Sequence, residues 1–172
     1  MIIYDIGAKS VQVELAHTGG DWQRAAVAAW VSRWRRQQWP ADLLGVACLP
    51  SLDGASVLTW SQWATDAEPW SLWGLDGPPG YSSGPRTYHR LGRVGSRSAA
   101  PGFFGLTRLG NLGQARDWLD ALPARPKAVA GELYFREDGR GFLGLSGWRE
   151  PVTDGYRVHT ALSAPVSVGH RS

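Results

Sequence analysis

Near the amino terminus, apolar residues first occur at every second position and then at the spacing typical of a helix. Apolar side chains at every second position predict a strand over residues 11–17. One face of this strand carries Val11, Val13, Leu15 and His17. Apolar residues then recur at helical spacing, which predicts a helix over 21–38 with Asp21 as its N-cap and Pro40 beyond its end. A strand followed by an amphipathic helix is therefore expected here.

One pattern then occurs twice: an apolar run, Asp-Gly, a second apolar run and a tryptophan. Asp53-Gly54 and Trp63 precede Asp138-Gly139 and Trp148 by 85 positions each. Asp-Gly between apolar runs is a strong hairpin signal, because the turn needs residues with positive φ. Hairpins are therefore predicted over 44–63 and 128–148.

The remaining elements complete two similar halves. They are a short helix over 64–73, a loop over 74–85, a strand over 86–94, a strand over 103–109, a helix from its cap Asn111 to Leu122, a turn over 151–155 and a strand over 157–168. Each half then has the order of a ferredoxin-like unit. The predicted fold is α+β: two ferredoxin-like repeats fused in one chain, with antiparallel sheets packed into an α+β barrel. The repeats are 1–94 and 103–172, joined by a linker over 95–102.

Composition narrows the class of protein. The 172 residues are 43% hydrophobic and 19% charged, enough apolar residue for a core. No apolar run is long enough for a membrane helix, and no signal peptide is evident, so a cytoplasmic protein is expected.

The net charge is +3, and the one tight arginine cluster, Arg33 with Arg35 and Arg36, fits a solvated helix face better than nucleic-acid binding. Cys48 is the single cysteine, which excludes multi-cysteine metal sites. Ten tryptophans suit a flat aromatic ligand as well as a core.

The first hairpin carries a recognisable motif. Pro50-Ser-Leu-Asp-Gly-Ala-Ser-Val-Leu-Thr-Trp-Ser-Gln-Trp63 resembles the signature of the antibiotic biosynthesis monooxygenase family, within the dimeric α+β barrel superfamily. The resemblance implies a cleft between sheet and helices that holds an aromatic polyketide. It also implies oxidation of a phenol or anthrone to a quinone or hydroxylated product by molecular oxygen, with no cofactor and no metal. A monomer or a homodimer is compatible with it.

One position departs from the family pattern. The quinone-forming members carry asparagine four residues before the tryptophan, where this chain has Thr59, and Gly144 in the second half. A threonine hydroxyl lacks the reach and the paired donors of an amide. The departure favours an alternative, a polyketide cyclase or ring-rearranging enzyme that uses the same cleft without oxygen.

The candidate site residues come from strand alternation and from acid–base chemistry. Trp63, Thr59 and Ser61 share one strand face, and the resemblance places that face in the cleft. Histidine is the natural base near neutral pH for removing a phenolic or benzylic proton, and His89 is the preferred candidate. Catalytic roles are thus predicted for His89, Thr59 and Trp63. Substrate contacts are predicted for Ser61, Trp70, Trp73, Tyr88, His17 and Trp148.

A further alternative is a non-catalytic protein that binds an aromatic product or haem. His159 or His89 would then be the axial ligand. Motifs for phosphate or dinucleotide binding, and for a serine nucleophile, do not occur in their required contexts.

Overall fold

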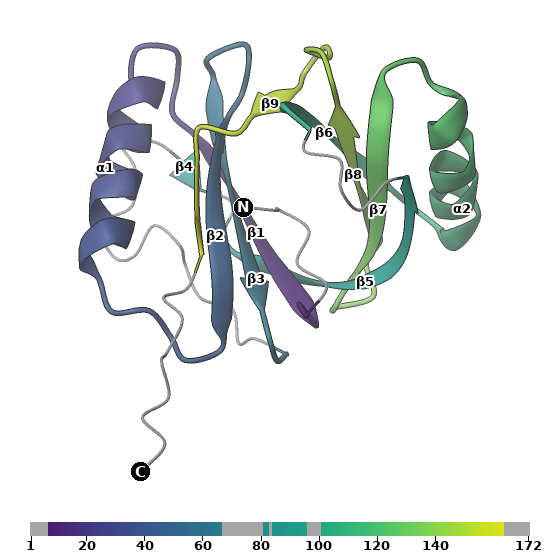
Figure 1. The fold of residues 1–172 in the computed structure, drawn as a ribbon, viewed down its shortest axis with the longest axis horizontal. Coiled ribbons are helices and arrows are strands. Elements are labelled where there is room, and N and C mark those ends of the chain that lie inside the picture. The colour runs from purple at the N-terminus through teal and green to yellow at the C-terminus, as the bar shows by residue number, and fades with distance from the viewer. Residues whose placement is uncertain (1–6, 67–80, 83, 96–100, 164–172) are drawn as a thin grey trace.

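The computed structural model describes residues 7–66, 81–82, 84–95 and 101–163. Two helices flank strands that curve into a barrel, with α1 and α2 on opposite outer sides (Figure 1). The helical segments are α1 (Gln23–Arg36), α2 (Leu112–Ala121) and the 3-10 turn η1 (Leu122–Ala124). The strands are β1 (Ser10–His17), β2 (Leu43–Pro50), β3 (Ser56–Trp63), β4 (Tyr81–Ser82), β5 (Arg86–Gly95), β6 (Phe103–Leu109), β7 (Ala128–Arg136), β8 (Phe142–Trp148), β9 (Tyr156–Arg157) and β10 (Thr160–Ser163).

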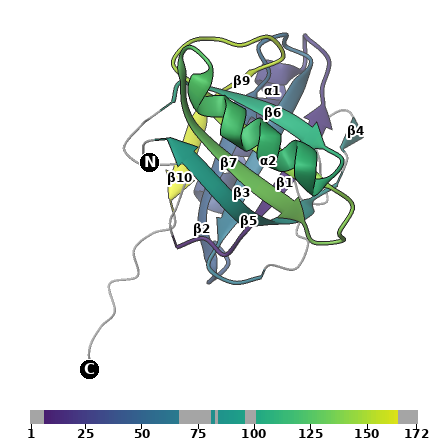
Figure 2. The ribbon, with the colours of Figure 1, turned by 90° about the vertical axis from the view of Figure 1, so that its right-hand side faces the viewer.

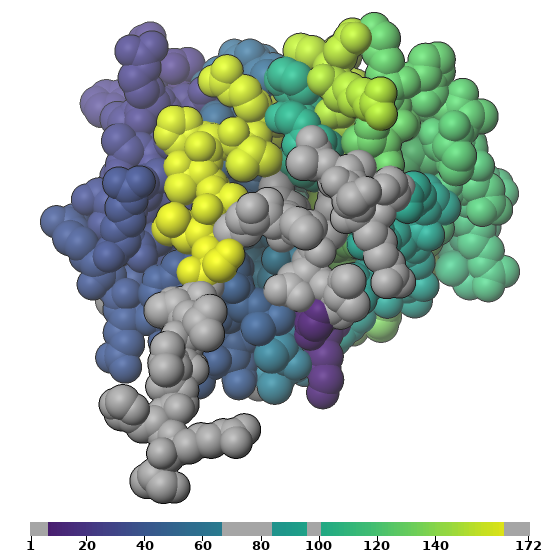
Figure 3. Space-filling view, in the orientation of Figure 1, coloured from purple at the N-terminus to yellow at the C-terminus, as the bar shows by residue number. Residues whose placement is uncertain are grey.

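The strands form one antiparallel sheet that closes on itself. Their order is β10-β2-β3-β1-β5-β7-β8-β6-β9, with β4 paired to β1. The two end strands, β9 and β10, are separated along the chain by residues 158–159. Tyr156 of β9 pairs with Phe104 of β6 and also forms a bridge to Ser51, just after β2, so that it links the two ends of the sheet. In Figure 3 the last described residues (yellow) accordingly lie against the first half (blue). The α+β class predicted from the sequence is confirmed.

The two hairpins share their turn chemistry. Gly54 and Gly139 both have positive φ, 80° and 71°. Asp53 Oδ1 accepts from the Ala55 N–H at 2.9 Å, and Asp138 Oδ1 accepts from the Arg140 N–H at 3.0 Å. Glycine adopts such a backbone without steric cost, and the preceding carboxylate closes the turn. Hydrogen bonds from the Ser51 hydroxyl and the Ala55 N–H lower the pKa of Asp53.

The register of the two hairpins also corresponds. Leu43 pairs with Trp63 and Ala128 with Trp148, and each pair is followed by a bulge on the first strand. Both bulged strands also pair outside their own half: β7 with β5, and β2 with β10. The halves therefore exchange strands in the same way at both joins, and the barrel is completed within one chain.

Each face of the sheet buries a different apolar cluster. The barrel interior holds Val11, Val13, Leu58, Trp60, Tyr88, Tyr134 and neighbours. The space between α1 and the sheet holds Trp30, Trp34, Val57, Trp63 and neighbours, with Trp39 packed against them. The rings of Trp30 and Trp34 lie 5.9 Å apart, and those of Trp34 and Trp39 lie 5.4 Å apart. Several tryptophans thus fill the core beneath α1.

Helix α2 covers the second half (Figure 2). Its N-cap is Asn111 as predicted, since Asn111 Oδ1 accepts from the Gln114 N–H at 2.9 Å. A Cβ on Gly144 of β8 would lie 2.7 Å from the Trp118 ring of this helix. The absence of a side chain at Gly144 therefore lets the indole rest directly on the sheet.

Three local predictions in the first half need correction. Asp21 is not the cap of α1, because the left-handed turn at Gly19 makes Trp22 the N-cap, with no side-chain hydrogen bond. The predicted helix over 64–73 does not start at Ala64, since 64–66 form a bend; the rest of it lies outside the described residues. The predicted loop over 74–85 contains β4, and most of the linker over 95–102 is also outside.

The predicted strand over 157–168 is divided. Its first part, β9, pairs with β6, whereas β10 pairs with β2. The chain must pass from one half of the barrel to the other at this point, so one continuous strand cannot serve both partners. The turn over 151–155 is present, with the Gly155 N–H donating to the Val152 carbonyl at 3.0 Å.

Candidate active site

Polar side chains gather on the outer face of β1, β3 and β5, the face turned away from the barrel interior. Directly opposite residues of antiparallel strands share a face. Because β1 pairs with both neighbours, Gln12 lies between Ser61 of β3 and Thr87 of β5. The same registers add the pairs on either side. This polar face consists of Ser10, Gln12, Glu14, Thr59, Ser61, Trp63, Thr87 and His89.

The polar face is shielded from water. Seven of its eight residues are at most 5% exposed, and the His89 side chain is 26% exposed. Buried polar groups are costly unless they are hydrogen-bonded, so sheets seldom turn such a set toward the protein. Places where a sequence departs from apolar packing are expected to be functional. His89 is the least buried member of the polar face.

Hydrogen bonds hold these side chains in place. The Trp63 indole Nε1–H donates to Ser61 Oγ at 2.8 Å. The Gln12 amide Nε2–H donates to Thr87 Oγ1 at 3.4 Å, linking β1 to β5. An aromatic wall and an amide are therefore fixed side by side on adjacent strands.

The bend after β3 closes one end of the polar face. The Ser10 hydroxyl donates to the Thr65 carbonyl at 2.7 Å, so this bend crosses β1. It also brings Asp66 to β5, where Asp66 Oδ1 lies 3.5 Å from His89 Nδ1. A carboxylate beside one ring nitrogen orients an imidazole.

The corresponding face of the second half has different contents. In the first half, Thr59 pairs with Glu14, and the matching pair of the second half is Gly144 with Thr107. Likewise, Ser61 pairs with Gln12 in the first half, and Ser146 pairs with Gly105 in the second. The Trp148 Nε1–H donates to Ser146 Oγ at 2.8 Å, the same bond as in the first half. Trp118 occupies the space above Gly144. The second half is thus packed where the first half is polar.

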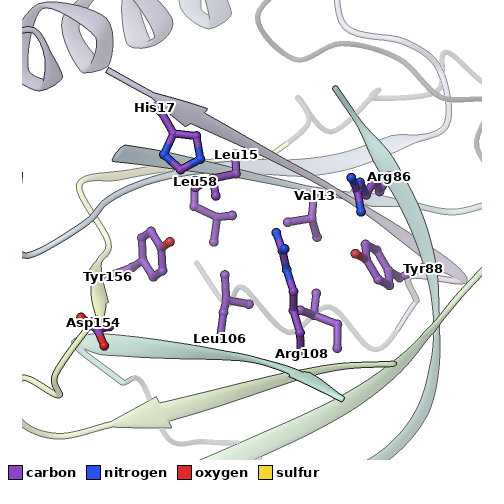
Figure 4. A pocket seen from close by; sticks show the side chains of 11 residues that line it. Val13, Leu15, His17, Leu58, Arg86, Tyr88, Leu106, Arg108, Asp154 and Tyr156 are labelled. Carbon is purple, nitrogen blue, oxygen red and sulfur yellow. The ribbon is translucent and has the colours of Figure 1, made fainter. Parts of the chain in front are cut away.

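The structure brings together four of the residues predicted for the site and separates the others. Thr59, Ser61, Trp63 and His89 all lie on the polar face. Tyr88 and His17 lie on the opposite side of the sheet, lining a cavity inside the barrel (Figure 4). Trp148 belongs to the second half, and Trp70 and Trp73 lie outside the described residues.

Sequence reasoning missed half of the polar face. Ser10, Gln12, Glu14 and Thr87 alternate with the apolar residues that defined the predicted strands. The first strand is predicted from its apolar face, and no role is predicted for the polar positions between those residues. A signal was available, since the predicted ferredoxin-like order places the first strand between two others, with a helix over one face and the barrel on the other.

Two features are absent from the described part of the chain. It contains no cluster of three or more histidine, cysteine, aspartate or glutamate side chains able to hold a metal ion. None of its helices combines the length and apolar character needed to cross a membrane.

Comparison with known proteins places this geometry on a known fold. No family model matches the sequence, and no curated protein matches it. Among solved structures, an anthrone oxidase-like protein superimposes with a TM-score of 0.67 at 12% identity, covering 95% of each chain. The chain shares the fold of that protein. A candidate monooxygenase from Lactobacillus acidophilus NCFM has the fold as well, with a TM-score of 0.52 at 8% identity, covering 83% of this chain and 78% of its own. The fold implied by the hairpin motif is therefore confirmed.

Proposed function

We propose that this protein is an oxygenase of the antibiotic biosynthesis monooxygenase family, acting on the polar face of β1, β3 and β5. The proposed reaction is the cofactor-independent oxidation of a phenol or anthrone ring of an aromatic polyketide to a quinone or hydroxylated product. One observation carries the proposal: Trp63 and the His89–Asp66 pair converge, from different strands, on one buried polar face of this fold.

His89 is the proposed general base. Oxygen accepts an electron from an aromatic substrate readily only after the substrate has lost a phenolic or benzylic proton. The pair with Asp66 at 3.5 Å holds the imidazole in place and stabilises the imidazolium that forms. For an anthrone, one methylene proton passes to His89 and the resulting carbanion transfers one electron to dioxygen.

The remaining steps balance with dioxygen as the only oxidant. The substrate radical and superoxide combine in a new C–O bond, and the peroxide takes up a proton. Loss of the second methylene hydrogen as a proton, with cleavage of the O–O bond, then gives the quinone and water. The polar face would exclude bulk water from these intermediates, since seven of its residues are buried.

Gln12 is the proposed donor to the substrate oxyanion, once its amide gives up the hydrogen bond to Thr87 Oγ1. Its amide lies opposite Ser61, one strand away from Thr59, the position where the family pattern has asparagine. A preorganised amide stabilises charge that develops on a phenolate or enolate oxygen. Gln12 would thereby replace the missing amide from the neighbouring strand.

Oxygen uptake tests the proposal. Purified, metal-free protein is given an anthrone or a dihydroxynaphthalene, and dioxygen consumption is recorded with product mass after reaction under ¹⁸O₂. We expect uptake by the native protein and one labelled oxygen in the quinone. The substitution His89→Gln should slow it by at least about 100-fold, the usual contribution of a general base. His159→Gln, an exposed histidine outside the polar face, is the matched control and should leave the rate unchanged. Absence of uptake with several such substrates would refute the proposal.

A cyclase is the second candidate, and one contact favours it. The Thr59 hydroxyl donates to the Glu14 carbonyl at 3.2 Å, so it is engaged within the sheet instead of facing a ligand. His89 would then act as acid and base on a polyketide without consuming oxygen. Conversion of a linear polyketide analogue under anaerobic conditions, with equal rates in air, would identify this activity.

A further inference from the structure

A cavity of about 420 Å³ opens inside the barrel, on the side of the sheet opposite the polar face. Its walls come from both halves: β1 and β5 of the first, and β6 and β8 of the second (Figure 4). Its volume lies within the usual range of small-molecule sites, about 300–1,000 Å³. The sheet formed by β1, β3 and β5 separates this barrel cavity from Trp63 and His89, because successive side chains of a strand point to opposite faces.

The barrel cavity is apolar at its base and charged at its rim. Leu58, Leu143 and Tyr88 are buried, with 1%, 4% and 8% of their surface exposed. Arg86 is half-buried, and Arg108 is exposed. A ligand that matches the apolar base and the charged rim has an apolar body and a charged group at one end.

The charge at the rim favours an anion. Arg86 and Arg108 both line the barrel cavity, whereas Asp154 is the one carboxylate among the described residues that line it. Neither arginine forms a salt bridge with an acidic side chain in the described part of the chain. Guanidinium groups bind carboxylates in a planar, two-point geometry, which lysine cannot reproduce.

Tyr156 adds a hydrogen-bond donor. Burial raises the pKa of its phenol, with the hydrogen bond to Ser56 and the charge of Arg108 acting in the opposite direction. The phenol is therefore neutral across the physiological range and keeps its proton for an acceptor oxygen. The aromatic rings of Tyr88 and Tyr156 belong to different strands that face one cavity, a suitable pair of walls for a flat ring.

We infer that the barrel cavity is a second binding site, one that takes a small aromatic carboxylate. The carboxylate lies between Arg86 and Arg108, and the ring lies toward Leu58 and Leu143. The site is independent of the proposed oxygenase reaction, because no residue of the polar face lines it.

Calorimetric titration with 1-naphthoate tests this site. We expect saturable one-to-one binding by the native protein and at least tenfold weaker binding of the methyl ester, which has the same ring without the charge. The double substitution Arg86→Gln with Arg108→Gln should weaken naphthoate binding at least tenfold. Arg116→Gln, which changes an exposed arginine of α2, is the matched control and should bind as the native protein does.

A second variant keeps the test decisive if the arginine variant folds poorly. Leu106→Trp fills the barrel cavity from a half-buried position and should abolish binding of both acid and ester. Circular dichroism establishes that each variant is folded before titration. Equal affinity of acid and ester, or unchanged affinity of either folded variant, would overturn the inference. The proposed oxygen uptake depends on the opposite face of the sheet. A loss or retention of oxygen uptake therefore does not bear on ligand binding in the barrel cavity.

Discussion

The outer faces of the two half-sheets have the same strand register but differ in the side chains that they carry. In the first half, Thr59 stands opposite Glu14, and Gln12 opposite Ser61. In the second, the matching positions include Gly144 and Gly105, and Trp118 fills the space above Gly144. The second half shows that this fold can be packed with apolar side chains. We therefore assign the chemistry to the first half, whose outer face carries the larger polar set.

The largest expected effect concerns the packed face. Trp118→Ala removes an indole that is 8% exposed and rests on Gly144, and should lower the free energy of unfolding by about 3–5 kcal/mol. Urea denaturation followed by circular dichroism measures the change. Trp22→Ala is the matched control, because Trp22 is 58% exposed and should contribute little.

A double-mutant cycle sharpens this prediction. Gly144→Ala alone places a Cβ 2.7 Å from the Trp118 ring and should cost about 1–3 kcal/mol through overpacking. In the Trp118→Ala background the same substitution should cost almost nothing. If the two costs simply add, the indole does not rest on Gly144, and the contrast between the halves is lost.

The next prediction concerns the polar face. Gln12→Met keeps the size of the side chain but removes its amide, and should slow oxygen uptake by about 10²-fold, as expected for loss of an oxyanion donor. Gln38→Met changes an exposed glutamine beyond α1 and serves as the control. Unchanged turnover in Gln12→Met would remove Gln12 from the proposed mechanism.

A smaller effect concerns the barrel interior, where the halves differ again. Glu132 of β7 is buried and accepts a hydrogen bond from the Tyr134 hydroxyl, whereas Ala47 takes the matching position of β2. Burial raises the pKa of Glu132 above its ordinary value of 4.5, although Tyr134, Arg90 and Arg93 act in the opposite direction.

The sign of the pH dependence follows from proton binding. Above pH 4.5 the folded protein keeps the Glu132 proton where the unfolded chain has lost it, so stability falls as pH rises toward the raised pKa. Glu132→Gln should remove this part of the slope in urea melts recorded between pH 4 and 8. Glu137→Gln, an exposed neighbour, should retain it. A slope that persists in Glu132→Gln would show that another group titrates.

The smallest expected effect is a lack of reactivity. Burial raises the pKa of Cys48 to about 12, so the thiolate that reacts with disulfide reagents is scarce at neutral pH. Cys48 lies in the core beneath α1, where the matching residue of the second half is Leu133. We expect no reaction with Ellman's reagent in the native state and complete reaction in urea. Rapid native labelling would show that the α1 side opens readily.

Local sequence chemistry predicted the parts of the fold that depend on neighbours in the chain. The Asp-Gly turns and the Asn111 cap are set within a few residues, and the structure contains them. Asp21 failed as a cap because the turn at Gly19 shifts the start of α1 by one residue beyond it. Fusion of two ancestral units remains a prediction, supported by the matching registers.

The candidate site was less accessible to sequence reasoning. Alternation showed that Thr59, Ser61 and Trp63 share a face, but only the pairing of β1 with both neighbours joins them to His89 and Gln12. Arg86, Arg108 and Tyr156 come from three strands that meet only when the barrel closes. The spacing of these residues along the chain therefore does not predict that they lie around one cavity.

The most direct test of the account compares two equivalent tryptophans. Trp63 and Trp148 each donate to a serine hydroxyl at 2.8 Å, one on each half-sheet, so Trp63→Phe and Trp148→Phe remove the same interaction. The initial rate of dioxygen consumption with an anthrone is measured for both. We predict a loss of about tenfold in Trp63→Phe, equivalent to one hydrogen bond, and the native rate in Trp148→Phe. Equal losses in the two variants, or a loss confined to Trp148→Phe, would contradict the assignment of the chemistry to the first half.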